Sequence, residues 1–252
     1  MIDVMMTPGE LEAVGSLAGA QVVVLDVLRA TSTVVSALAA GARGVRLFGS
    51  LEEARAGRAA WSASDGPVVL AGESQCLKPA DFDLGNSPRE MVTEKVGGAT
   101  VLLATTNGTR AAARARLAGA DLLYAGSLLN AGATAERLLE HVDERRTVFL
   151  CSGTGGKLAL EDVLGAGAIL FAMLGRSYRA DLPFTDGAWL AYHAYAGVRA
   201  RVGAALRLGI GGVNVIEAGL EDDIDWCARV DGMGVVAAVD VETLRVTKAE
   251  EL

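Results

Sequence analysis

Residues 21–42, QVVVLDVLRATSTVVSALAAGA, constrain the fold more than any other part of the chain. Residues 22–25 form an apolar run that is too short for a helix and is typical of a buried parallel strand. A turn with Asp26 and Arg29 follows, and then a helix that we expect to begin at the hydroxyl cluster 31–33, whose oxygens can cap it. Asp26 and Arg29 are therefore predicted at the carboxyl end of a strand beside a helix N-terminus, where open α/β sheets bind anions. The alternative is an ordinary turn in which the two side chains pair.

The same alternation of strand and helix continues along the chain. We expect further strands at residues 45–48, 67–71, 99–104, 147–151 and 235–240. Ser50, with Glu53 three positions later, predicts a capped helix over residues 49–61. The sequence therefore predicts an α/β fold in which helices flank a mostly parallel or mixed sheet.

Two segments of the chain look like copies of one unit. Residues 22–54 and 101–131 both run strand, polar turn, helix, Ala-Gly-Ala, strand, Gly-Ser-Leu, helix. This predicts a single α/β domain over residues 1–252, with an internal duplication of a βαβ unit and pseudo-repeat halves near 20–98 and 99–175. Chance similarity between segments rich in Ala, Gly and Leu is the competing explanation.

Charge and cysteine usage narrow the function classes. The formal net charge is −8, which argues against nucleic acid or an anionic membrane surface as a partner. Three scattered cysteines give no disulfide framework, and the N-terminal segment lacks the pattern of a signal peptide. The longest apolar run, near residues 163–174, is too short to span a bilayer. We expect a cytoplasmic protein.

The apolar helices of the second half could form a homodimer face, although burial within the domain explains them equally well.

Three predicted strands end in polar turns: the 26–31 turn, TTNGTR at 105–110 and SGTGG at 152–156. An irregular polar loop at residues 72–91 adds a fourth segment, and its length indicates function or disorder. If these turns share one rim of a parallel sheet, they form a single anion site, because their amides, hydroxyls and glycine backbone suit an oxyanion. Separately, each turn could simply cap a helix.

The titratable residues favour oxygen chemistry. Both histidines fall in predicted helices away from the turns, and the turn that ends in Lys157 lacks the Ser or Thr of a P-loop. Carboxylates without His or Cys suit a hard cation such as Mg²⁺, which can bridge to phosphate oxygens. For Glu161 and Asp162, stabilisation of a helix N-terminus is an equally good explanation. The candidates are Asp26, Glu73, Asp81, Asp83, Glu161 and Asp162.

Five segments, in this order, resemble the 2-phosphosulfolactate phosphatase family over nearly the whole chain: DVLRATSTVVSALAAGA, FDLGNSPRE, TTNGTRA, CSGTGG…LED and DDIDWCARVD. The resemblance implies a Mg²⁺-dependent phosphatase that converts 2-phospho-3-sulfolactate to 3-sulfolactate and phosphate. In methanogens this step belongs to coenzyme M biosynthesis, but family members also occur in bacteria that do not make coenzyme M. One departure concerns Ser74, Gln75 and Cys76, which stand where the family usually has an arginine and a glycine-rich stretch.

For the implied substrate, a small anionic phosphoester, we assign site roles as hypotheses. The expected catalytic residues are Asp26, Asp83 and Glu161, and the expected Mg²⁺ ligands are Asp26, Glu73 and Asp162. The expected substrate-binding residues are Arg29, Thr31, Lys78, Asn86, Ser87, Thr106, Asn107, Thr109 and Gly153. Attack by water, oriented by Asp83 or Glu161, and attack by Asp26 through an aspartyl-phosphate both remain open. So do two other functions: a phosphatase for another small organic phosphate, and a non-catalytic anion-binding protein.

Overall fold

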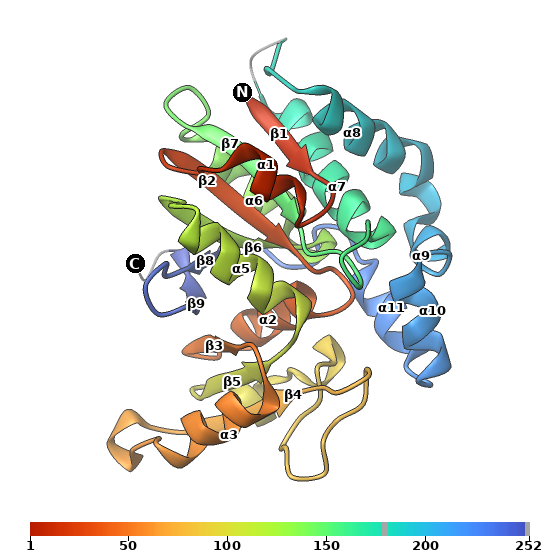
Figure 1. Cartoon of the computed structure of the whole chain (residues 1–252). Helices are drawn as coiled ribbons and strands as arrows, with labels where there is room; N and C mark the ends of the chain where they lie inside the picture. Colours follow the sequence, from red (N-terminus) through yellow and green to blue (C-terminus); the bar gives the residue numbers. More distant parts are fainter. Residues whose placement is uncertain (178–180, 250–252) are drawn as a thin grey trace.

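A nine-stranded mixed sheet with helices on both faces forms the protein (Figure 1). The computed structural model describes residues 1–177 and 181–249. The strands are β1 (Ile2–Met5), β2 (Ala20–Leu25), β3 (Gly44–Phe48), β4 (Val68–Gly72), β5 (Thr100–Ala104), β6 (Leu122–Gly126), β7 (Arg146–Cys151), β8 (Ala237–Val239) and β9 (Arg245–Lys248). The α-helices are α1 (Glu10–Val14), α2 (Ala30–Ala39), α3 (Leu51–Ala59), α4 (Thr93–Val96), α5 (Asn107–Leu117), α6 (Ala131–Leu139), α7 (Leu160–Arg176), α8 (Asp186–Val198), α9 (Val202–Leu206), α10 (Ile210–Glu217) and α11 (Glu221–Cys227). Short 3₁₀ helices are η1 (Ala63–Asp65), η2 (Pro88–Glu90), η3 (Leu128–Asn130) and η4 (Arg199–Arg201).

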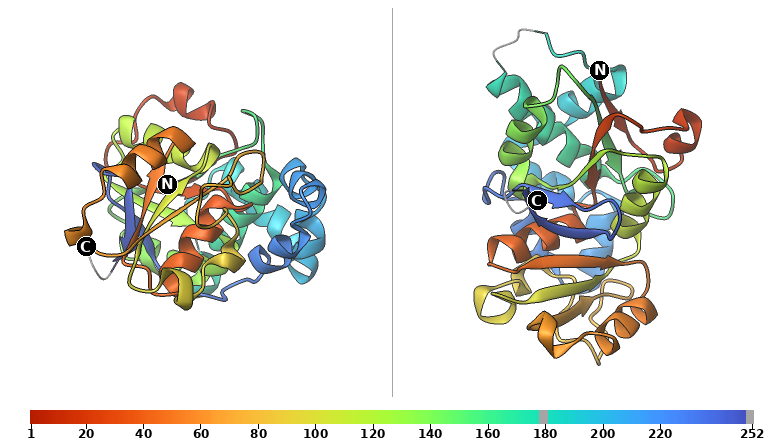
Figure 2. Two further views of the ribbon diagram at one scale, coloured as in Figure 1. Left: turned by 90° about the horizontal axis from the view of Figure 1, so that it is seen from below. Right: turned by 90° about the vertical axis from the view of Figure 1, so that its left-hand side faces the viewer.

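The sheet consists of two parallel blocks joined by an antiparallel hairpin. The strand order is β1-β7-β2-β6-β8-β9-β3-β5-β4, and β6–β8, β8–β9 and β9–β3 are the antiparallel pairs. These three reversals make the β3-β5-β4 block run opposite to the β1-β7-β2-β6 block along the sheet. The expectation that all polar turns lie at equivalent ends of parallel strands is therefore wrong. The right-hand view of Figure 2 shows the two blocks at a steep angle, as the twist of a large sheet produces.

The strand order has an internal correspondence. Exchanging β2, β3 and β4 with β5, β6 and β7, and β8 with β9, maps the order of the eight strands other than β1 onto itself in reverse. Helices α2 and α5, which connect corresponding strands, contact the same apolar cluster on one face of the sheet. An origin by duplication, and the division into pseudo-repeat halves, stay predictions.

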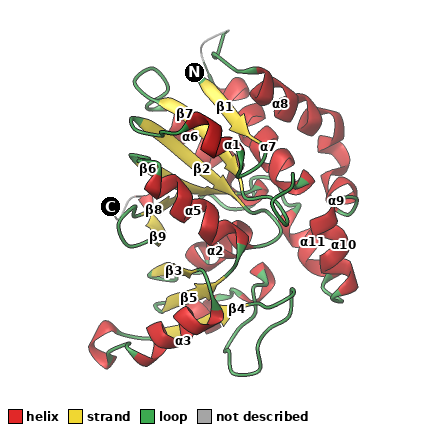
Figure 3. Ribbon diagram, in the orientation of Figure 1, coloured by secondary structure: helices red, strands yellow, loops and turns green. Residues whose placement is uncertain are grey.

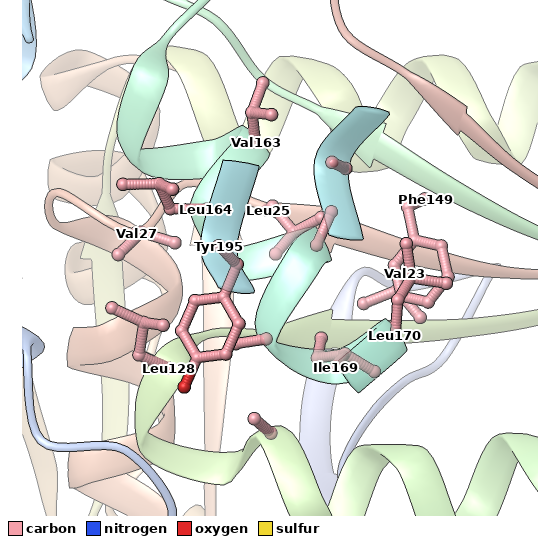
Figure 4. Close-up of a cluster of buried hydrophobic side chains, with 14 of the residues drawn as sticks. Val23, Leu25, Val27, Leu128, Phe149, Val163, Leu164, Ile169, Leu170 and Tyr195 are labelled. Atoms are coloured by element: carbon pink, nitrogen blue, oxygen red, sulfur yellow. The ribbon is translucent and has the colours of Figure 1, made fainter. Parts of the chain in front are cut away.

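The opposite face of the sheet carries a second cluster centred on α7 (Figures 3 and 4). Val23 and Leu25 of β2 point to this face, whereas Val22 and Val24 point to the α2–α5 face, so β2 is buried on both sides. Gly167 lets α8 approach α7 closely, because a Cβ there would overlap the carbonyl oxygen of Ala191. The buried strand predicted at residues 22–25 is thus confirmed.

Several local expectations can be compared with the structure. Ser50 caps α3 and accepts a hydrogen bond from the Glu53 amide at 3.1 Å, as predicted. The hydroxyl cap expected for α2 is wrong, because Arg29 is the N-cap residue and its side chain makes no capping hydrogen bond. The hydroxyls lie inside the first turn instead, where Ser32 donates to the carbonyl of Val27. The sequence interpretation missed β9. Among the described residues, no helix combines the length and apolarity needed to cross a membrane.

Candidate active site

Asp26 directly follows β2 and contacts the first turns of two helices. Its Oδ2 accepts the Gly108 amide at 2.6 Å, and Oδ1 accepts the Ala30 amide at 3.4 Å. One carboxylate therefore faces the first turns of both α5 and α2, although their preceding strands belong to opposite blocks. A Cβ at residue 108 would lie 3.0 Å from Asp26 Oδ2, closer than an ordinary contact, so glycine favours this close approach of the carboxylate.

The environment of Asp26 disfavours its charge. Burial raises the pKa of Asp26 to about 6. The amides of Gly108 and Ala30 act in the opposite direction, the neighbouring charge of Glu73 raises the pKa further, and Arg29 lowers it. Two carboxylates that repel each other in a partly buried site are the arrangement that a bound cation relieves.

Arg29 is held by residues from two distant segments. Nη1 donates to Asp223 Oδ2 at 2.6 Å, and Nη2 donates to the Cys76 carbonyl at 2.7 Å. Asp223 also accepts the Ser87 hydroxyl at 2.6 Å, and the side chains of Arg29 and Asp223 are 3% and 1% exposed. The alternative in which Arg29 pairs with Asp26 is excluded by this geometry. Instead, α11 and the loop after β4 fix the guanidinium beside Asp26.

These groups surround one cavity of about 90 Å³. Glu73 stands on its wall, with Oε2 accepting the Cys76 amide at 2.7 Å. Asn86 is 5% exposed and also lines the cavity, and its Oδ1 has no hydrogen-bond partner among the described residues. The full lining is Asp26, Leu28, Arg29, Glu73, Cys76, Asn86, Thr105, Thr106, Asn107, Thr154, Gly211, Asn214 and Val215.

Two predicted site residues at the start of α7 lie behind this wall. Asp162 accepts the Val27 amide at 2.9 Å and the Gly153 amide at 3.0 Å, so it ties the turn after β2 to the turn after β7. Burial, with the charges of Asp26 and Glu161, raises the pKa of Asp162 well above its ordinary value. Burial also raises the pKa of Glu161 to about 7, opposed by its own amide and reinforced by Asp26. Glu161 Oε2 has no hydrogen-bond partner in the described chain.

Other predicted residues support the site from outside the cavity. The Thr31 hydroxyl accepts the Asp26 amide at 3.2 Å, and the Thr109 hydroxyl bonds that of Thr105 at 3.1 Å. Asp83 lies apart, because its carboxylate accepts the Arg58 guanidinium at 2.6 Å and the Leu70 amide at 2.8 Å. The Lys78 ammonium donates to the Phe82 carbonyl at 3.1 Å.

The donor set can be compared with the needs of Mg²⁺. Among the described residues, no three His, Cys, Asp or Glu side chains gather closely enough to enclose a metal ion. Mg²⁺ commonly binds through one or two carboxylates and keeps several waters or substrate oxygens. Asp26 and Glu73, with the unpartnered amide oxygen of Asn86 on the same cavity, fit that pattern.

Sequence reasoning missed several cavity residues. Asp223, which supports the cavity through Arg29 and does not line it, lies in an acidic run that hides which carboxylate is buried. Asn214 and Gly211 come from α10 and gave no signal, because their helix reads as an ordinary apolar one. Only the packing of α10 against α7 and of α11 against η2 brings them to Glu161 and Arg29.

Comparisons with known proteins agree with this picture. The profile of a family described as 2-phosphosulpholactate phosphatase matches residues 5–241. The chain is 38% identical over 221 residues to a probable 2-phosphosulfolactate phosphatase of Synechococcus sp. (strain RCC307), covering 86% of this chain and 88% of the relative. Relatives with the same description from Thermus thermophilus and Parasynechococcus marenigrum are 39% and 40% identical. These alignments cover 90% and 91% of this chain, and 90% and 92% of the relatives.

Proposed function

The chain belongs to the 2-phosphosulpholactate phosphatase family, and from this premise we propose that it hydrolyses 2-phospho-3-sulfolactate to 3-sulfolactate and inorganic phosphate with Mg²⁺. The observation that carries the proposal is the position of Asp26. It is fixed by the N-terminal amides of two helices, beside Arg29 and Glu73, on one cavity.

Arg29 and the 105–107 turn bind the phosphate group in this proposal. A guanidinium carries five N–H donors, so those of Arg29 that are not used by Asp223 and Cys76 can reach phosphate oxygens. Thr105, Thr106 and Asn107 add hydroxyl and amide donors at the positive end of α5.

Asp26 and Glu73 would hold Mg²⁺, with Asn86 supplying an amide oxygen. The ion, when bound, neutralises charge on the phosphate oxygens during in-line displacement. Without a cation, two carboxylates on the cavity wall would oppose the entry of a phosphate group. Asp162 serves in this scheme as a buried brace, since it does not line the cavity and its two oxygens join the turns after β2 and β7 through backbone amides.

We assign the attack on phosphorus to water. Both oxygens of Asp26 accept backbone N–H groups, which suits a fixed ligand better than a nucleophile. The new P–O bond forms to the water oxygen and the bond from phosphorus to the C2 oxygen breaks. That oxygen leaves as the hydroxyl of 3-sulfolactate, with the proton that the attacking water gives up.

Phosphate release from 2-phospho-3-sulfolactate tests the proposal. We expect one phosphate for each 3-sulfolactate formed, loss of release with EDTA and recovery with excess Mg²⁺. Release that is unchanged by EDTA would contradict the metal requirement. A complete lack of release from the substrate at any Mg²⁺ concentration would contradict the function.

A second phosphoester substrate is favoured by one local observation. Gln75 and Cys76 adopt φ values of 51° and 67°, a left-handed backbone that glycine adopts more easily, and Cys76 lines the cavity. The sequence departure at residues 74–76 therefore reaches the site itself. A panel of small phosphoesters would identify this alternative if another member were hydrolysed with a higher kcat/KM than 2-phospho-3-sulfolactate.

A further inference from the structure

A second cavity of about 250 Å³ adjoins the candidate active site. Asn107 lines both cavities, so the two meet at the first residue of α5. Arg110 and Arg114, one and two turns further along α5, line the second cavity together with Ser152 and Gly156 of the loop after β7. Pro8, Gly9 and Glu12, in and just before α1, complete this side of the lining.

The charge in this second cavity is unbalanced. Arg110 and Arg114 are exposed residues at i and i+4, so they present like charges on one face of α5. Neither forms an ion pair within the described residues, whereas Arg55 and Arg58 each bond a carboxylate of the loop after β4. The exposed side chain of Glu12 also lines the cavity, beyond ion-pair distance of both arginines.

Ser152 supplies a second, independent observation. It is 5% exposed, lines the cavity, and its hydroxyl has no hydrogen-bond partner among the described residues. Buried hydroxyls are normally satisfied, and a hydroxyl beside two arginines can donate to an oxyanion. A cationic pair and an unpartnered donor thus border the same volume.

We infer that the second cavity is an oxyanion subsite that holds the sulfonate of the substrate while the first cavity holds its phosphate. This inference rests on the proposed function. The substrate carries phosphate, carboxylate and sulfonate, whereas the cation on the first cavity, Arg29, is already paired with Asp223. A distal sulfonate therefore needs a positive charge of its own. Arg110 and Arg114 provide it one and two turns of α5 beyond Asn107.

Comparison of two substrates tests this subsite. 2-Phospholactate has a hydrogen where 2-phospho-3-sulfolactate has the sulfonate. We expect Arg114→Ala to raise KM for phosphosulfolactate about tenfold or more and to change kcat/KM for phospholactate less than about twofold, since only the former loses a charge-assisted contact. Arg116→Ala is the matched control, because Arg116 lies in the same last turn of α5 and bonds the Glu242 carbonyl instead. Equal KM values for phosphosulfolactate in the Arg114 and Arg116 variants would overturn the inference.

A binding experiment separates this inference from the proposed function. Calorimetric titration with the product 3-sulfolactate needs no turnover. We expect the wild-type protein and Arg116→Ala to bind it alike, and the double variant Arg110→Ala/Arg114→Ala to bind it at least tenfold more weakly. If the wild-type protein hydrolyses neither phosphoester, the proposed function fails, and this titration alone decides the subsite. Unchanged binding by the double variant, or no binding by the wild-type protein, overturns it. The inference is also overturned if binding of inorganic sulfate depends on the two arginines while binding of 3-sulfolactate does not.

Discussion

Asp26 and Asp83 are both acidic residues in polar segments that follow parallel strands, and the sequence assigns catalysis to both. Their surroundings differ. Asp26 faces Glu73 and two helix N-termini in a buried cavity, and burial raises its pKa to about 6. Partial burial alone would raise the pKa of Asp83, but the Leu70 amide and the Arg58 guanidinium outweigh it and lower that pKa. Asp81 beside it has its pKa lowered mainly by a hydrogen bond from Arg55.

The difference shows what separates a reactive carboxylate from a structural one in this protein. In the outer part of the loop after β4, each carboxylate has an arginine partner and solvent nearby, so its charge is satisfied. In the cavity, the available arginine is taken by Asp223, and the carboxylates are left with each other. Unsatisfied charge of this kind is typical of sites that await a ligand.

The largest effect that we expect comes from Asp26→Asn. Loss of the negative charge should lower kcat/KM on the order of 10³-fold, because it removes a fixed contact to the reacting centre. Phosphate release at saturating Mg²⁺ measures this. Asp83→Asn is the control and should stay within about threefold. Comparable losses in the two variants would remove the distinction between the two regions.

The same variant, Asp26→Asn, should lose activity but gain stability. The folded pKa of Asp26 lies above the unfolded value, so the folded state binds more protons in this window and stability falls as pH rises from about 4 to about 6. Metal-free Asp26→Asn should therefore be more stable than wild type at pH 8, by about 1 to 3 kcal/mol. Denaturant unfolding measures the difference, and a clear destabilisation would contradict the buried charge.

A smaller catalytic effect is expected for Asp223→Asn. This change leaves the buried Arg29 guanidinium without its charged partner, so kcat/KM should fall about 10- to 100-fold and the free energy of unfolding by about 3 kcal/mol. The neighbouring Asp222 offers a control, since its ion pair with Arg89 is exposed and Asp222→Asn should cost less than about 1 kcal/mol. Equal behaviour of the two variants in activity and unfolding would show that Arg29 does not depend on α11.

The smallest effect concerns Asp83→Asn. Its lowered pKa stabilises the fold above about pH 4, and this contribution disappears as pH falls through the folded pKa. The side chain is 47% exposed, so the loss at pH 7 should be about 0.5 to 1 kcal/mol. Thermal unfolding at pH 7 and pH 3 should show the difference from wild type shrinking on acidification. A difference that grows at low pH would contradict the assignment of Asp83 to a surface ion pair.

The sequence predicted those features of the site that depend on residues close together in the chain, and it missed those that depend on residues far apart. The buried strand of β2, the cap at Ser50 and the location of Asp26 and Arg29 depend on neighbours within a few residues, which a pattern records. The partner of Arg29 lies 194 positions away, at Asp223, and no local pattern reports that contact. The same limit explains why the opposite direction of the two sheet blocks was not predicted. The β8–β9 hairpin, which reverses the strand direction between the blocks, comes last in the chain. A cytoplasmic location, the homodimer and the lack of a nucleic-acid partner stay predictions.

Titration of the aspartate side-chain carboxyls by ¹³C NMR in the metal-free protein tests the contrast between the two regions most directly. The account predicts that Asp26 titrates near pH 6 and Asp83 below about 3.9, the value of a free aspartate. Added Mg²⁺ should lower the apparent pKa of Asp26 and leave that of Asp83 unchanged. An Asp26 that titrates near 4 and does not respond to Mg²⁺ would contradict the account.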